Sequence, residues 1–228
     1  MQVAFGDRRT HILLLVSCLG DDLCLSLSST DSFVSLVSMS TASSVLAWNW
    51  VTFDDETKSV YDAFVKEKID HDLDVNPPKQ FLQVRYPRDL VVKLGTYVTP
   101  RDSRSEPVVS WAPSANTDYY TLIIVDPDNP QMEGQYVHML RVNIPFPGRP
   151  GYGAIGYKKP FPIVPRTLAR PSHRYIFLVY QQTNRIEHPG ILMYMKSNLY
   201  SFKLSDFVKV FPVHSDPLAG NFMHGEIY

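Results

Sequence analysis

Acidic and histidine side chains that could hold a ligand occur close to β-like segments in the second half of this 228-residue chain. Asp126 and Asp128 flank Pro127 directly after an apolar run, and His138 and His173 lie in two later runs. A protonated histidine can pair with a phosphate oxygen, and a carboxylate beside it raises its pKa and keeps it cationic. The residues therefore predict a site for an anionic or zwitterionic head group, provided that folding brings them together.

Other interpretations of the same residues remain open from the sequence alone. Two histidines and two carboxylates could hold a metal, although close ligand spacing such as H-x-x-x-H is missing. Aspartates around a proline are also typical turn residues that satisfy backbone amides. His138 is compatible with a core histidine bonded to a carbonyl, and His173 with a strand start that faces water.

An enzyme is less well supported than a binding protein. The chain has no Gly-x-Ser-x-Gly motif, and its two cysteines, Cys18 and Cys24, precede the part that reads as a domain. The sequence therefore predicts no catalytic residue, no cofactor and no metal. A metal-assisted hydrolase that uses the Asp/His cluster is kept as an alternative.

The elements that position these residues are mostly strands. Residues 119–125 are apolar throughout, which predicts a central strand buried on both faces. Alternating or short apolar runs predict further strands at 81–86, 90–95, 108–111, 136–144, 174–181 and 218–222. The predicted fold class is mainly β, a Greek-key β-sandwich or central sheet with a few short peripheral helices.

Two segments have helical spacing. In residues 56–69, Val60, Phe64 and Lys68 share a face, which predicts a short surface helix leading into the domain. In residues 201–211, apolar side chains recur at i, i+3, i+4 and i+7 before a proline, which predicts a second helix.

One domain behind an N-terminal extension is the predicted organisation. Residues 1–47 are Ser-rich with an apolar run of about signal-peptide length, so they read as unstructured, signal-like or wrongly assigned sequence. Residues 48–67 read as a linker and short helix, and 68–228 as the domain. Within the domain, the density of prolines and glycines in 145–171 predicts a long loop without regular structure at a pocket rim.

Composition narrows the partners. The formal net charge is −1 and the sequence pI is about 6.6, so no field of one sign would gather nucleic acid. No apolar run approaches the ~20 residues of a transmembrane helix. We expect a monomer in the cytoplasm, with secretion as the alternative if the N-terminal apolar run is a signal.

Three blocks resemble the signature of the phosphatidylethanolamine-binding protein family, which includes the Raf kinase inhibitor protein and plant flowering regulators. They are Asp-Pro-Asp-Asn-Pro at 126–130, His-Met-Leu-Arg-Val-Asn at 138–143 and His-Arg-Tyr at 173–175. The resemblance implies a non-enzymatic binding protein, with a protein partner such as a kinase or protease. It also implies a small pre-formed pocket for phosphate head groups, lined by Asp126, Pro127, Asp128, Pro130, His138, His173 and Tyr175.

Departures from the family pattern fall at the predicted pocket rim. Pro171 replaces a glycine, Glu133 stands where an aromatic residue is usual, and Met223 stands where a tyrosine closes the pocket. The chain ends at Tyr228, where relatives continue into a C-terminal helix beside the pocket mouth. A scaffold or interaction module with a vestigial pocket is therefore a further alternative.

Overall fold

A computed structural model describes residues 53–114, 118–129, 132–145, 150–160, 172–190, 192 and 201–226, all within the unit Trp50–Tyr228. The predicted extension 1–47, the linker up to residue 52 and the chain end at Tyr228 lie outside the described residues. Pro130 and Pro171 lie outside them as well.

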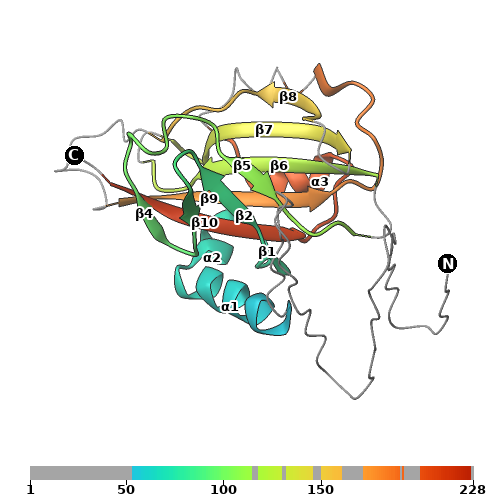
Figure 1. The fold of residues 1–228 in the computed structure, drawn as a ribbon. Coiled ribbons are helices and arrows are strands. Elements are labelled where there is room, and N and C mark those ends of the chain that lie inside the picture. The colour runs from blue at the N-terminus through green and yellow to red at the C-terminus, as the bar shows by residue number, and fades with distance from the viewer. Residues whose placement is uncertain are drawn as a thin grey trace, which may run out of the picture. The chain divides into compact units, whose positions relative to one another are not determined.

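Most of the described elements are strands (Figure 1). They are β1 (Gln80–Phe81), β2 (Gln83–Tyr86), β3 (Leu90–Val92), β4 (Thr96–Val98), β5 (Val108–Ser110), β6 (Tyr119–Asp126), β7 (Tyr136–Pro145), β8 (Tyr152–Ile155), β9 (Ser172–Gln181) and β10 (Ala219–Glu226). The helices are α1 (Phe53–Lys66), α2 (Ile69–Leu73) and α3 (Leu204–Val210). The predicted mainly-β fold with a few short helices is confirmed.

A large sheet organises the described part of the chain. Its order is β1-β10-β9-β6-β7-β8, and β4 also pairs with β10. The strands from β10 to β8 are antiparallel neighbours, whereas β1 and β4 run parallel to β10. Because β6 and β9 are adjacent, the end of β6 meets the beginning of β9. This pairing brings the acidic turn after β6 next to the third family block.

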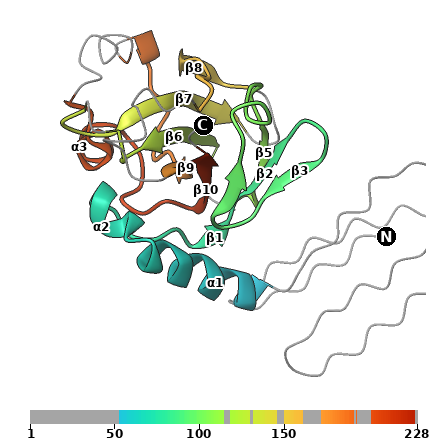
Figure 2. The ribbon, with the colours of Figure 1, turned by 90° about the vertical axis from the view of Figure 1, so that its left-hand side faces the viewer.

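Both faces of the large sheet are covered, which explains the unbroken apolar run in β6. On one face, Tyr120, Leu122 and Ile124 pack in a core with Val84 and other residues of the smaller sheet β3-β2-β5. On the other face, residues of β6 pack with α1, α2 and α3. Figure 2 shows the large sheet between the smaller sheet and α3. The predicted central strand, buried on both faces, is confirmed.

Helix α1 contributes directly to the core. Val60 and Phe64 are almost fully buried, and the Phe64 ring meets the Phe222 ring edge-on with centroids 5.5 Å apart. The helix ends at Lys66, and Lys68 takes a left-handed conformation (φ 57°) before α2 begins at Ile69. The predicted helix over 56–69 is therefore wrong at its end. The left-handed turn buries Ile69 and leaves Lys68 exposed, so burial of an apolar side chain decides the break.

The prediction that the Gly/Pro-rich region 145–171 has no regular structure is also wrong, because this region contains β8. Strand β8 pairs with β7 and buries Ala154 and Ile155. Gly151 makes this return possible: its φ is +63°, and a Cβ there would lie 2.6 Å from the Val142 carbonyl oxygen. Gly151, which suggests a loop in the sequence, thus allows the backbone to enter β8 close beside β7. Residues 146–149 and 161–171 lie outside the described residues.

We expect Phe64→Ala to lower the free energy of unfolding by about 3–5 kcal/mol, because it removes a buried ring and leaves a cavity. Tyr61→Ala is the matched control on the same helix: Tyr61 is 53% exposed, and its loss should change stability by less than about 0.5 kcal/mol. Urea unfolding of the full chain measures both. Equal effects of the two substitutions would contradict the packing of α1 on the large sheet.

Candidate functional site

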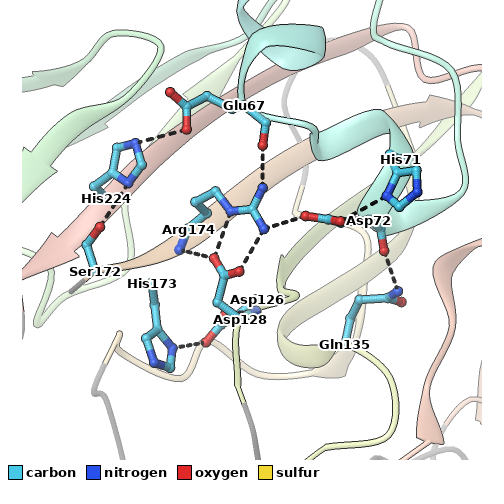
Figure 3. Close-up of polar contacts among 10 residues, drawn as sticks. All are labelled: Glu67, His71, Asp72, Asp126, Asp128, Gln135, Ser172, His173, Arg174 and His224. Carbon is cyan, nitrogen blue, oxygen red and sulfur yellow. Dashed lines mark hydrogen bonds and ion pairs between the residues drawn. The ribbon is translucent and has the colours of Figure 1, made fainter. Parts of the chain in front are cut away.

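The end of β6 and the beginning of β9 bring Asp126 and His173 into an ion pair (Figure 3). His173 Nδ1 lies 2.7 Å from Asp126 Oδ2, and both side chains are at most 3% exposed. The second Asp126 oxygen, Oδ1, accepts a hydrogen bond from the backbone amide of Asp128 at 2.8 Å. Asp126 is therefore held by the turn that follows it, and it orients the His173 ring.

The Asp126 contact leaves the far nitrogen of His173 available. Its Nε2 atom is buried and has no hydrogen-bond partner among the residues that the structure describes. Burial lowers the pKa of His173, but the hydrogen bond and charge of Asp126, with the charge of Asp128, outweigh it and leave the pKa raised. The raised pKa extends the imidazolium form, in which Nε2 carries a proton that it can donate, to a higher pH than in an ordinary histidine.

The pKa of His138, on β7, is shifted in the opposite direction to that of His173. Its Nδ1 lies 2.8 Å from the backbone carbonyl oxygen of Lys158 and donates to it. Burial lowers the pKa of His138, and the Lys158 carbonyl and Asp126 offset this only in part. A neutral ring that donates through Nδ1 has a lone pair on Nε2. The interpretation of His138 as a carbonyl-bonded core histidine therefore describes its Nδ1 contact.

Tyr175 joins the two histidines. Its ring centroid lies 5.0 Å from that of His138, edge-on, and 6.4 Å from that of His173. Burial raises the pKa of Tyr175, and the charge of Asp126 adds to the effect, so the hydroxyl keeps its proton. Gly225 on β10 leaves room for this ring, since a Cβ there would lie 2.4 Å from Tyr175 Cε2.

Asp128 pairs with an arginine, Arg174, rather than with a histidine. Its Oδ2 accepts hydrogen bonds from the backbone amide of Arg174 at 2.9 Å and from Arg174 Nε at 2.8 Å, and its Oδ1 accepts from Nη2 at 2.7 Å. The side chains of Asp128 and Arg174 are 3% and 5% exposed. Arg174 also contacts Asp72 and the carbonyl of Glu67, from the α1–α2 corner. Asp128 thus holds the turn in place against Arg174.

The remaining predicted positions fall around this cluster. Pro127 is half-buried between the two aspartates. Glu133 is exposed, and the aromatic ring beside His138 comes from Tyr136, with centroids 4.8 Å apart. Met223 is fully buried and pairs across the strands with Tyr175. The structure therefore groups Asp126, His138, His173 and Tyr175. Asp128 is connected to this group through its backbone amide, which donates to Asp126.

Sequence reasoning missed Arg174 and Lys158 as partners of the site. A signal for Arg174 was present: it is a lone charge within the apolar strand 172–181, and a buried charge requires a partner. Nothing in the sequence indicates Lys158, because it contributes a backbone carbonyl. Nor does any local pattern connect Arg174 to Asp72, which lies 102 residues earlier.

Chemically, the cluster brings together a histidine with a raised pKa, His173, a histidine with a lowered pKa, His138, and the phenol of Tyr175. Across the described ranges, no group of three or more His, Cys, Asp or Glu side chains is arranged to hold a metal ion. None of the helices described is both long and apolar enough to cross a bilayer.

We expect the two histidines to titrate on opposite sides of the ordinary histidine pKa of 6.5, His173 above it and His138 below it. Linkage gives the signs for stability. The contribution of His173 is fully present below about pH 6.5 and is lost as the pH rises through its raised pKa. That of His138 is present above about pH 6.5 and is lost as the pH falls through its lowered pKa.

Carbon-detected or proton–carbon NMR of the imidazole Cε1 groups measures both values. Asp126→Asn should lower the pKa of His173, because burial then acts without the carboxylate that offsets it. His188, an exposed histidine outside the cluster, provides the internal reference. An unchanged His173 titration in the Asp126→Asn protein would contradict the assigned ion pair.

Comparisons with known proteins bear on the fold and the family. The chain is 32% identical over 157 residues to the 26 kDa secreted antigen of Toxocara canis; the match covers 65% of this chain and 57% of the length of that relative. Among solved structures, it is similar to a carboxypeptidase Y inhibitor complexed with its cognate proteinase, with a TM-score of 0.59 and 20% identity, over 77% of this chain and 98% of that one. It is also similar to a phosphatidylethanolamine-binding protein from Plasmodium vivax, with a TM-score of 0.55 and 18% identity, over 74% and 98%.

The structural matches show the fold, and the family is shown by the sequence. The family model described as phosphatidylethanolamine-binding protein matches residues 83–223, which is more than half of the chain and includes the acidic turn and both histidines. The chain therefore belongs to the phosphatidylethanolamine-binding protein family.

Proposed function

We propose that this chain is a non-enzymatic binding protein whose Asp/His cluster takes a phosphate head group or a similar small anion. The observation that carries the proposal is His173 Nε2, which is buried and unpartnered among the described residues, on a ring whose imidazolium form Asp126 stabilises. A buried donor without a partner costs about 1–3 kcal/mol, and more when charged. An anion oxygen would satisfy it.

The arrangement also answers the repulsion expected between a phosphate and two aspartates. Asp126 is paired with His173, and Asp128 with Arg174, so each carboxylate has a cation at hydrogen-bond distance. Opposite charges at this separation offset most of each other's field on a third group. The proposed ligand therefore meets a cationic donor rather than two free carboxylates.

The neutral state of His138 gives the proposed site a preference. Its Nε2 lone pair can accept a hydrogen bond, so a ligand that carries a proton beside its negative charge matches both rings. A phosphate monoester anion or an ammonium-bearing zwitterion has this pattern, whereas sulfate does not. We expect a protonated phosphate to bind more tightly than sulfate.

A protein partner and the compartment are also proposals. A protease is the partner class that we favour over a kinase, because the similar carboxypeptidase Y inhibitor was solved in complex with its cognate proteinase. For the compartment, the sequence predicts the cytoplasm, with secretion as the alternative. The secreted antigen among the relatives supports the alternative.

Titration calorimetry of the full chain with O-phosphorylethanolamine, inorganic phosphate, ethanolamine and sulfate tests the proposed ligand. We expect saturable binding of the two phosphates at pH 6 and weaker binding at pH 8. His173 loses its proton as the pH rises through its raised pKa. The phosphate monoester loses its second proton near pH 6, and inorganic phosphate does so about one unit higher. Sulfate has no proton to lose in this range, so its affinity change reports the protein alone.

His173→Gln should weaken phosphate binding at least about tenfold, because a hydrogen bond to a charged group is worth about 1.5–3 kcal/mol. His188→Gln is the matched control, since His188 is exposed and lies outside the cluster and the Arg174 network. A folded protein that gives no heat at millimolar phosphate would overturn the head-group proposal. The description as a scaffold with a vestigial pocket would then replace it.

A further inference from the structure

Arg174 connects the candidate site to the corner between α1 and α2 (Figure 3). Its guanidinium donates to Asp128 in the turn, to Asp72 Oδ2 on α2 at 2.6 Å, and to the carbonyl oxygen of Glu67 just after α1. The planar fork of an arginine can make these contacts at once, which the compact ammonium of a lysine cannot reproduce. The acidic turn after β6 and the α1–α2 corner, which are distant in sequence, therefore meet at one side chain of β9.

The contacts of Arg174 constrain both members of the His173–Asp126 pair. On one side, Arg174 holds Asp128, whose amide in turn donates to Asp126 Oδ1. On the other side, Arg174 directly follows His173 in β9, and its own amide donates to Asp128 Oδ2. Movement of the guanidinium would thus shift the carboxylate and the strand that carries the imidazole.

Glu67 contacts β9 by a second route. His224 on β10 lies with Nε2 3.8 Å from the Glu67 carboxylate and with Nδ1 3.3 Å from the Ser172 hydroxyl. Ser172 directly precedes His173. The residues on either side of His173 are therefore both connected to the corner that follows α1.

The network also leads from the buried cluster toward solvent. Arg174 and Asp128 are 5% and 3% exposed, whereas the Asp72 side chain is 27% exposed. Lys68 and Asp74, which border α2, both have left-handed backbone conformations, so α2 is a short segment between two turns. A change at this corner can reach Asp126 through hydrogen bonds alone.

We propose that Arg174 is the positioning residue of the His173–Asp126 pair, and that the α1–α2 corner sets the anion affinity of the site through Asp72. The affinity part rests on the proposed function, whereas the positioning part does not. The contrasting account is a purely structural one, in which Arg174 only compensates buried charge. The two accounts predict opposite changes in phosphate affinity for Asp72→Asn. For Arg174→Lys, one predicts a changed His173 pKa and the other an unchanged one.

Asp72→Asn separates the accounts by the sign of its effect on inorganic phosphate binding at pH 6. Removing a negative charge near an anion site should strengthen binding if charge alone matters. If Asp72 acts by holding Arg174, binding should instead weaken by on the order of threefold to tenfold, as for residues that couple to a site without touching it. Asp70→Asn is the matched control, because it removes the same charge from α2, and the guanidinium contacts of Arg174 within the described residues go to Asp128, Asp72 and Glu67 instead. Stronger phosphate binding in Asp72→Asn, equal to that in Asp70→Asn, would overturn the proposal.

Arg174→Lys tests positioning without any ligand. It keeps the charge and removes the fork, so a structural role predicts a less stable protein with an unchanged His173 titration. Positioning predicts a lower His173 pKa, measured by imidazole NMR on protein whose amide spectrum shows it to be folded. An unchanged His173 pKa in folded Arg174→Lys protein would overturn the assignment.

These arms keep the two proposals apart. If the wild-type chain binds no phosphate, the proposed function fails, and the His173 titration of Arg174→Lys still decides the role of Arg174. If Arg174→Lys does not fold, the His173 pKa in Asp72→Asn is compared with that in Asp70→Asn. A lower value in Asp72→Asn supports positioning, and equal values overturn it.

Discussion

Burial of the Arg174 guanidinium is the constraint on which the site depends. A charge removed from water is tolerated only when oppositely charged and hydrogen-bonding groups surround it. Asp128 meets this requirement from the acidic turn, and Asp72 and the Glu67 carbonyl meet it from the α1–α2 corner. The acidic turn after β6 is thereby fixed against the helical corner, and the Asp126 carboxylate beside it is fixed against His173. The geometry of the candidate site is in this sense a consequence of a buried charge behind it.

The chemistry of the site comes from two histidines with different partners. Asp126 faces His173 with a carboxylate and raises its pKa above the ordinary value, against the effect of burial. Lys158 faces His138 with a neutral carbonyl, and there burial prevails and lowers the pKa. One fold thus holds a cationic donor and a neutral acceptor against the same tyrosine ring. A protonated anion complements that pair better than a bare dianion does.

Much of the fold could be predicted from the sequence, because burial on both faces leaves an unmistakable apolar run in β6. Helix α1 was predicted, but its end was not. The left-handed turn at Lys68 depends on the burial of the next side chain, Ile69, in the core. Strand β8 was missed because Gly151 reads as a loop residue. That the aspartates and histidines belong to one site could be proposed from residue type and family blocks. The contacts of Arg174 could not, because they join β9 to the acidic turn and to a helical corner that is about a hundred residues earlier in the sequence.

The most direct test of the central claim is the pKa of His173, measured by imidazole NMR in the full chain with and without saturating phosphate. Binding of an anion to the cationic ring must raise that pKa by linkage, since the ligand favours the protonated form. We therefore expect a higher His173 pKa with phosphate present and no comparable change at the exposed His188. A His173 titration that is identical with and without millimolar phosphate, in folded protein, would contradict the account.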